Sequence, residues 1–82
     1  MEQKGRFDLI PPHGLLRVAV RMEHGVGKHG DFEAGRSASV FLDKIQRHAN
    51  QIARGETDED HWAAIACDAL CAMESENQKG KP

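Results

Sequence analysis

Aromatic side chains are scarce in this sequence of 82 residues, which has no tyrosine, one tryptophan and three phenylalanines. A platform that stacks unpaired bases is built from aromatic rings, so we do not expect single-stranded nucleic acid to be the ligand. Lysine and arginine together number 11, against 13 aspartates and glutamates. This slightly acidic balance argues against a protein that coats nucleic acid, because such a protein needs a strongly basic surface.

Long apolar stretches are also missing. No run approaches the about 18 apolar residues of a membrane-spanning helix, and the polar beginning of the chain is unlike a secretory signal peptide. Cysteine occurs twice, as Cys67 and Cys71, without a Cys-x-x-Cys motif. Two cysteines on one predicted helix are poorly placed for a disulfide. We therefore expect free thiols, a reducing cytoplasmic compartment and no membrane partner.

Apolar residues recur at helical spacing in three segments, which predicts an all-α protein that forms a single domain over 1–82. Gly55 is the predicted end of the second helix, and Thr57 or Asp58 the predicted cap of the third. A chain this short buries only roughly 60–65% of its surface, so we expect a homo-oligomeric helical bundle. The predicted segments are an extended arm (1–12), helices over 12–28, 37–54 and 58–74, and a flexible tail (75–82).

The turn between the second and third predicted helices gathers acidic residues beside a histidine. His61 is followed by Asp68, and on a helix this spacing places both side chains on one stripe. Carboxylates hold hard divalent cations, and histidine binds metals or transfers protons. Acids at a helix start also stabilise its positive end by about 0.3–1 kcal/mol each. Asp58, Glu59 and Asp60 therefore have a purely structural interpretation as well.

Several motifs, taken in chain order, form a pattern that is similar to a known family. The motifs are Gly5-Arg-Phe-Asp-Leu-Ile-Pro-Pro12, His24-Gly-Val-Gly-Lys-His-Gly30, Arg47-His48, Gly55-Glu56 and His61. Together they resemble the N-terminal domain of dATP/dGTP diphosphohydrolases, a phage-associated family similar in type to the MazG-like pyrophosphatases. The resemblance implies an oligomeric all-α fold that cleaves a nucleoside triphosphate to the monophosphate and pyrophosphate with Mg²⁺ or Mn²⁺.

The resemblance also indicates candidate site residues. Glu56 and His61 would be catalytic, and Asp68 would join them in holding the metal. Cationic and polar side chains suit phosphate groups, and the candidates for binding the nucleotide are Arg6, Asp8, Lys28, Arg47 and His48.

Each of these candidates has a structural alternative. His61 could be an ordinary first-turn histidine, and His48 a packing or capping one. Arg47 and Lys28 could belong to a solvated helix face, and either could pair with Asp68, because burying an unpaired carboxylate is costly. In the arm, Arg6 and Asp8 could contact the ligand or hold the arm in place.

Two functions remain open at this level. The first is a metal-dependent diphosphohydrolase that acts on purine (d)NTPs. The second is a non-catalytic protein that sequesters a nucleotide or cyclic-nucleotide signal for a phage in the host cytoplasm. Gly27 favours the second, because the family commonly carries an acid there; the sequence also has Asp68 where the family often has asparagine. A small DNA-binding regulator is weaker, because 57–73 contains no lysine or arginine to face bases.

Overall fold

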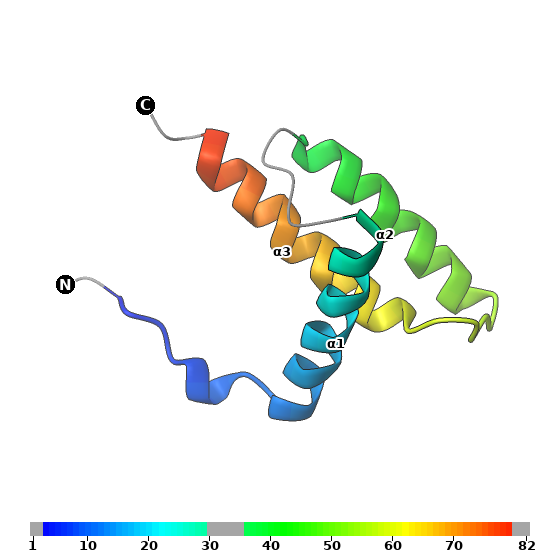
Figure 1. The fold of residues 1–82 in the computed structure, drawn as a ribbon, viewed down its shortest axis with the longest axis horizontal. Coiled ribbons are helices and arrows are strands. Elements are labelled where there is room, and N and C mark those ends of the chain that lie inside the picture. Colours follow the sequence, from blue (N-terminus) through cyan, green and yellow to red (C-terminus); the bar gives the residue numbers. More distant parts are fainter. Residues whose placement is uncertain (1–2, 30–35, 80–82) are drawn as a thin grey trace.

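The computed structural model describes residues 3–29 and 36–79. Within these ranges the chain is helical and contains no strand, which confirms the all-α prediction (Figure 1). None of the helices in the described part has the length and apolar character needed to cross a membrane. The elements are a short 3-10 turn, η1 (Phe7–Leu9), and the helices α1 (Pro12–His29), α2 (Ala38–Ala53) and α3 (His61–Lys79).

Helix α3 is central because it packs against both other helices, whereas α1 and α2 make no close backbone contact among the described residues. Figure 1 shows α2 and α3 running side by side as a hairpin, with α1 crossing the end of α3 that begins the helix. Small side chains at this crossing allow close approach. Ala63, Ala64 and Cys67 of α3 are buried, and Phe41 of α2 is buried as well.

Cys67 links α3 to α1. Its thiol donates to the backbone carbonyl of Val18 at 3.5 Å. Burial raises the pKa of Cys67 to about 11, so the group stays a protonated thiol at neutral pH. Cys67 and Cys71 are both free, which confirms the prediction that they form no disulfide.

Helix α2 ends in a Schellman motif. The N–H of Gly55 donates to the carbonyl of Ile52 at 2.9 Å, and the N–H of Glu56 donates to Gln51 at 3.0 Å. Gly55 has φ of +79°, a left-handed conformation that glycine adopts without steric cost. The predicted helix end at Gly55 is therefore confirmed, and it sets the direction in which the chain leaves α2.

Helix α3 begins three residues later than predicted, at His61 rather than 58. The physical reason is the cap. Asp60, rather than Thr57 or Asp58, accepts the N–H of Ala63 through its Oδ1 at 3.1 Å. The residues before Asp60 are thereby left in the bend between the helices.

The other end of α3 also differs from the prediction. The helix continues to Lys79 instead of ending at 74, so 75–79 are helical rather than part of a tail. Ser75 is buried, and its hydroxyl donates to the backbone carbonyl of Arg36 at 2.8 Å. This tertiary bond anchors the added turn to the chain just before α2. The rest of the predicted tail, 80–82, lies outside the described residues.

Candidate metal centre

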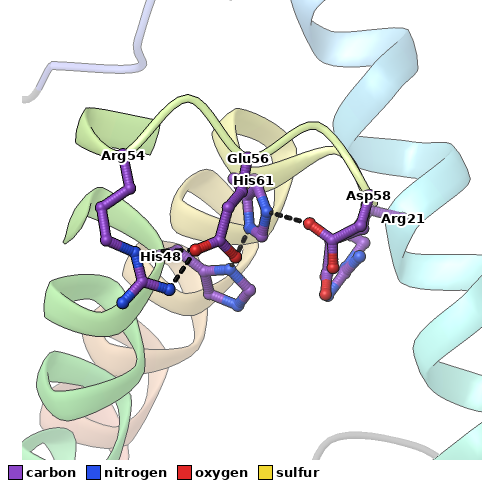
Figure 2. A network of polar contacts seen from close by, with 7 residues as sticks. Arg21, His48, Arg54, Glu56, Asp58 and His61 are labelled. Carbon is purple, nitrogen blue, oxygen red and sulfur yellow. Dashed lines mark hydrogen bonds and ion pairs between the residues drawn. The ribbon is translucent and has the colours of Figure 1, made fainter. Parts of the chain in front are cut away.

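His61 is the buried centre of a polar cluster at the turn of the hairpin. Only 3% of its surface is exposed, because it is the first residue of α3 and lies beneath the bend. Both of its ring nitrogens have partners (Figure 2). Nε2 lies 2.8 Å from Oδ1 of Asp58, and Nδ1 lies 2.8 Å from Nδ1 of His48. The ring is therefore held in one orientation.

The turn that follows α2 positions a second carboxylate. Arg54 and Glu56 flank Gly55, and Nε of Arg54 donates to Oε2 of Glu56 at 2.7 Å. The Arg54 Nη2 group contacts the same oxygen. Figure 2 shows Glu56 directed toward the rings of His48 and His61. The three residues that follow α2, Arg54 to Glu56, thus bring the Glu56 carboxylate to the cluster through local geometry.

Helix α1 contributes two arginines, one turn apart, that bind the bend before α3. Arg21 pairs with Oε1 of Glu59 at 2.7 Å. Arg17 donates to both carboxylate oxygens of Asp60, at 2.6 and 2.8 Å. This pairing, together with the backbone bond from Ala63, lowers the pKa of Asp60 to about 2. These contacts fix the acidic bend against α1.

The cluster contains two overlapping groups of three potential metal ligands. One is His48, Glu59 and His61; the other is Glu56, Asp58 and His61. Within each group the donor atoms lie within 4.8 Å of one another. Among the described residues, Glu56 pairs with Arg54 and Glu59 with Arg21, whereas Asp58 contacts His61. The resulting negative charge and the mixed nitrogen and oxygen donors suit a divalent cation.

Asp68 does not join this cluster, although it was predicted to share a metal with Glu56 and His61. Seven residues of helix rise by about 10.5 Å, so Asp68 lies two turns along α3 and belongs to neither ligand group. Burial raises the pKa of this half-buried carboxyl, and the charge of Lys44 opposes the rise most strongly. The predicted metal trio is therefore not assembled in the described structure.

Three of the predicted nucleotide-binding residues lie elsewhere. Arg6 and Asp8 bind one another at 2.7 Å on the exposed arm, far from the hairpin turn in Figure 1. Arg47 pairs with Asp43 at 2.6 Å on the exposed surface of α2. The side chain of Lys28 lies outside the described residues. Of the members of this predicted set whose side chains are described, His48 is the one that reaches the cluster.

The comparisons with known proteins fit the pattern of motifs. A model of the family described as dATP/dGTP diphosphohydrolase, N-terminal, matches residues 1–81. The chain belongs to this family. No curated protein and no solved structure matches the chain. The whole His61 cluster lies within the part that matches the dATP/dGTP diphosphohydrolase N-terminal family, which supports a relationship to nucleotide hydrolases.

Sequence reasoning missed Glu59, Arg21 and Arg54 as members of this site. The position of Glu59, two residues before His61 in an acidic run, was a usable signal, but it fitted a helix-start interpretation equally well. Arg54 stands two residues before Glu56, a spacing that allows a local ion pair. Arg21 carried no signal, because its place depends on how α1 crosses α3.

Proposed function

We propose that the protein is a nucleotide diphosphohydrolase that uses a divalent cation to cleave purine (d)NTPs to the monophosphate and pyrophosphate. Membership of the dATP/dGTP diphosphohydrolase N-terminal family supports the substrate class. The observation that carries the proposal is the buried His61, held between Asp58 and His48 with two glutamates beside it. Such a set of donors suits the handling of phosphate groups through a cation.

The reaction requires a water molecule, whose oxygen bonds to the α-phosphorus while the bond to the bridging oxygen breaks and pyrophosphate leaves. A bound divalent cation would supply Lewis-acid stabilisation of the phosphate charge. Glu56 is suited to accept the proton of the water, because Arg54 contacts Oε2 and leaves Oε1 to act as the base. The buried ring of His61 is held in a fixed position, and it orients the carboxylates around it.

The nucleotide itself would be bound by groups outside this cluster. Arg47 is exposed on α2, one residue before His48, and its guanidinium suits a phosphate. Lys28, Arg6 and Asp8 keep their predicted roles in nucleotide binding, and a second copy of the chain would complete the site. We include the homo-oligomer in the proposal because the predicted site combines helices from more than one chain.

A second candidate is sequestration of an intact nucleotide or cyclic nucleotide. Gly27 favours it, since this residue stands where the resemblance leads us to expect an acid. A protein that has lost one carboxylate of its site can keep its affinity for phosphates while losing hydrolysis.

One incubation separates the two functions. The protein is mixed with Mg²⁺ or Mn²⁺ and a panel of dNTPs, NTPs and cyclic nucleotides, and the solution is analysed by mass spectrometry. The washed protein is then heat-denatured and the released ligand is identified. Monophosphate and pyrophosphate, lost in Glu56→Gln but not in the matched exposed variant Glu74→Gln, would support hydrolysis. An intact nucleotide released only by heat would support sequestration. If every ligand in the panel gives neither cleavage nor retention, both functions are rejected.

A further inference from the structure

Asp58 determines the tautomer of His61. Its Oδ1 lies 2.8 Å from Nε2 of His61. The carboxylate of Asp58 has no hydrogen to donate and can only accept a hydrogen bond. Nε2 of His61 therefore carries the hydrogen. In the neutral ring, the lone pair is then on Nδ1.

This lone pair faces a second imidazole. Nδ1 of His48 lies 2.8 Å away, and the two rings are tilted by 48° with centroids 5.1 Å apart, so they meet through their nitrogens rather than by stacking. Two nitrogens bonded to one tetrahedral ion at about 2.0–2.1 Å lie roughly 3.4 Å apart. A ring movement of roughly 0.6 Å, with the hydrogen of His48 on Nε2, would make both Nδ1 atoms ligands of one ion.

Glu59 supplies a third donor. Its carboxylate belongs to the ligand group with His48 and His61, in which all donor atoms lie within 4.8 Å of one another. Arg21 binds Oε1 of Glu59, so Oε2 can bind an ion while the guanidinium holds the carboxylate in place. The three donors come from α2, the bend and α3, and converge on one point.

We propose that Nδ1 of His48, Nδ1 of His61 and a carboxylate oxygen of Glu59 bind one divalent transition-metal ion, in preference to Mg²⁺. Imidazole nitrogen suits ions such as Zn²⁺ and Co²⁺, whereas Mg²⁺ requires oxygen ligands in octahedral geometry. Asp58 is a positioning residue that orients His61, as carboxylates do behind metal-binding histidines. The biological role of the ion rests on the proposed function, but its binding does not.

This assignment changes the ligand set that the sequence predicted. Glu56 lies beside the ion and is not a ligand, and Asp68 is two turns away. The competing ligand group is Glu56, Asp58 and His61. In that group the ion would have to replace the hydrogen on Nε2 of His61. Asp58, which now accepts a hydrogen bond from His61, would have to become a ligand. If His48, His61 and Glu59 hold the ion, a substitution at His48 weakens metal binding and one at Glu56 does not. If Glu56, Asp58 and His61 hold it, the effects are reversed.

The test uses metal alone. The metal-free full-length protein is titrated with Co²⁺ and followed by its visible absorption, without nucleotide. We expect His48→Gln and Glu59→Gln to weaken Co²⁺ binding more than Asp58→Asn, which should weaken it about 10–100-fold. Glu56→Gln and the exposed carboxylate variant Asp43→Asn should bind as the parent does. Zn²⁺ should displace Co²⁺, and an excess of Mg²⁺ should not.

Circular dichroism of each metal-free variant checks that the helices are intact. Glu59 is exposed on the bend, so its substitution tests the ligand set without removing packing. The proposal is overturned if Glu56→Gln abolishes Co²⁺ binding while His48→Gln does not, if Mg²⁺ displaces Co²⁺ readily, or if the folded parent binds no Co²⁺.

The proposed function and this metal assignment can each be rejected without the other. Bound Co²⁺ without cleavage or retention of any nucleotide would remove the function and leave the metal site. Conversely, nucleotide cleavage by a folded parent protein that binds no Co²⁺ would remove the metal site and leave the function.

Discussion

At the scale of single residues, Asp60 illustrates how one carboxylate joins local and tertiary structure. It caps α3 through the N–H of Ala63 and also binds both donor groups of Arg17 on α1. The capping bond is local in the sequence, whereas the ion pair spans 43 positions. Loss of charge at this position therefore loosens α1 from the bend without removing the cap.

The charge of Asp60 makes stability depend on pH in acid. Its folded pKa of about 2 lies below the ordinary 3.8, so the stabilisation is complete above the ordinary value and is lost as pH falls toward 2. Asparagine caps a helix as well as aspartate does, so Asp60→Asn isolates the ion pair. We expect this variant to lose up to about 1 kcal/mol of unfolding free energy at pH 7.

Urea denaturation followed by circular dichroism, repeated at several pH values, checks this expectation. The stability difference between the parent and Asp60→Asn should shrink between about pH 4 and pH 2. A difference that stays constant over this interval would show that the charge of Asp60 is not the cause. Asp43→Asn, which removes an exposed carboxylate within α2, is the control and should change stability by less than about 0.5 kcal/mol.

At the scale of elements, the end of α2 determines where the bend begins. The Schellman motif turns the chain at Gly55 and delivers Glu56 to the cluster one residue later. The arginines of α1 then hold the acidic end of the same bend. The bend is therefore fixed at both of its ends, although it contains no regular structure of its own.

We expect Gly55→Ala to lower the unfolding free energy by about 1 kcal/mol, because alanine is strained at a φ of +79° even though a Cβ there meets no atom within 4 Å. Gly14→Ala is the matched control. A Cβ at Gly14 also meets nothing within 4 Å, but this glycine is in helix α1, so alanine should stabilise by up to about 1 kcal/mol. Thermal unfolding measures both variants, and shifts of the same sign would contradict the argument.

The sequence predicts these elements well where the signal is local. Apolar periodicity and the glycine at position 55 were sufficient for three helices and for the end of α2. The start of α3 was misplaced because several consecutive acids can all cap, and only the ion pair with Arg17 distinguishes Asp60. The end of α3 depends on the bond between Ser75 and Arg36, which no local pattern contains.

The residues of the candidate site also separate into those that local sequence signals predict and those that depend on tertiary contacts. His61, Glu56 and His48 were identified from motifs in the sequence and do meet in the structure. Asp68 was included on the basis of helical spacing, which places residues on one face but says nothing about the distance along it. Glu59 was assigned to the helix start, because its role as a donor depends on His48 approaching from α2.

At the scale of the whole molecule, the described part of the chain buries little side-chain surface. Its radius of gyration is 14.0 Å, against about 12 Å for a compact chain of this length. No large side chain among the described residues has less than 2% exposure. Apolar side chains that are more than half exposed occur on the arm and all three helices, and include Phe7, Leu9, Leu16, Leu42, Trp62 and Met73.

In the predicted homo-oligomer, these exposed apolar side chains would be covered by neighbouring copies of the chain. If folding and association are coupled, the unfolding temperature rises with protein concentration. We expect such a rise over a hundred-fold range of concentration in differential scanning fluorimetry. Light scattering after size-exclusion chromatography should give a mass above the 9.1 kDa of one chain. A monomer mass with an unfolding temperature independent of concentration would reject the homo-oligomer.

The short chain distance across the His61 cluster has a consequence for the order of folding. His48 and His61 are 13 positions apart, with Glu56, Asp58 and Glu59 between them. Loops of about ten residues close in roughly 10–100 ns, and their closure entropy is small compared with that of long-range docking. The two imidazoles can therefore meet as soon as α2 and α3 pair. The contacts of Arg17 and Arg21 span about 40 positions, so we expect them to form later, after the cluster has assembled.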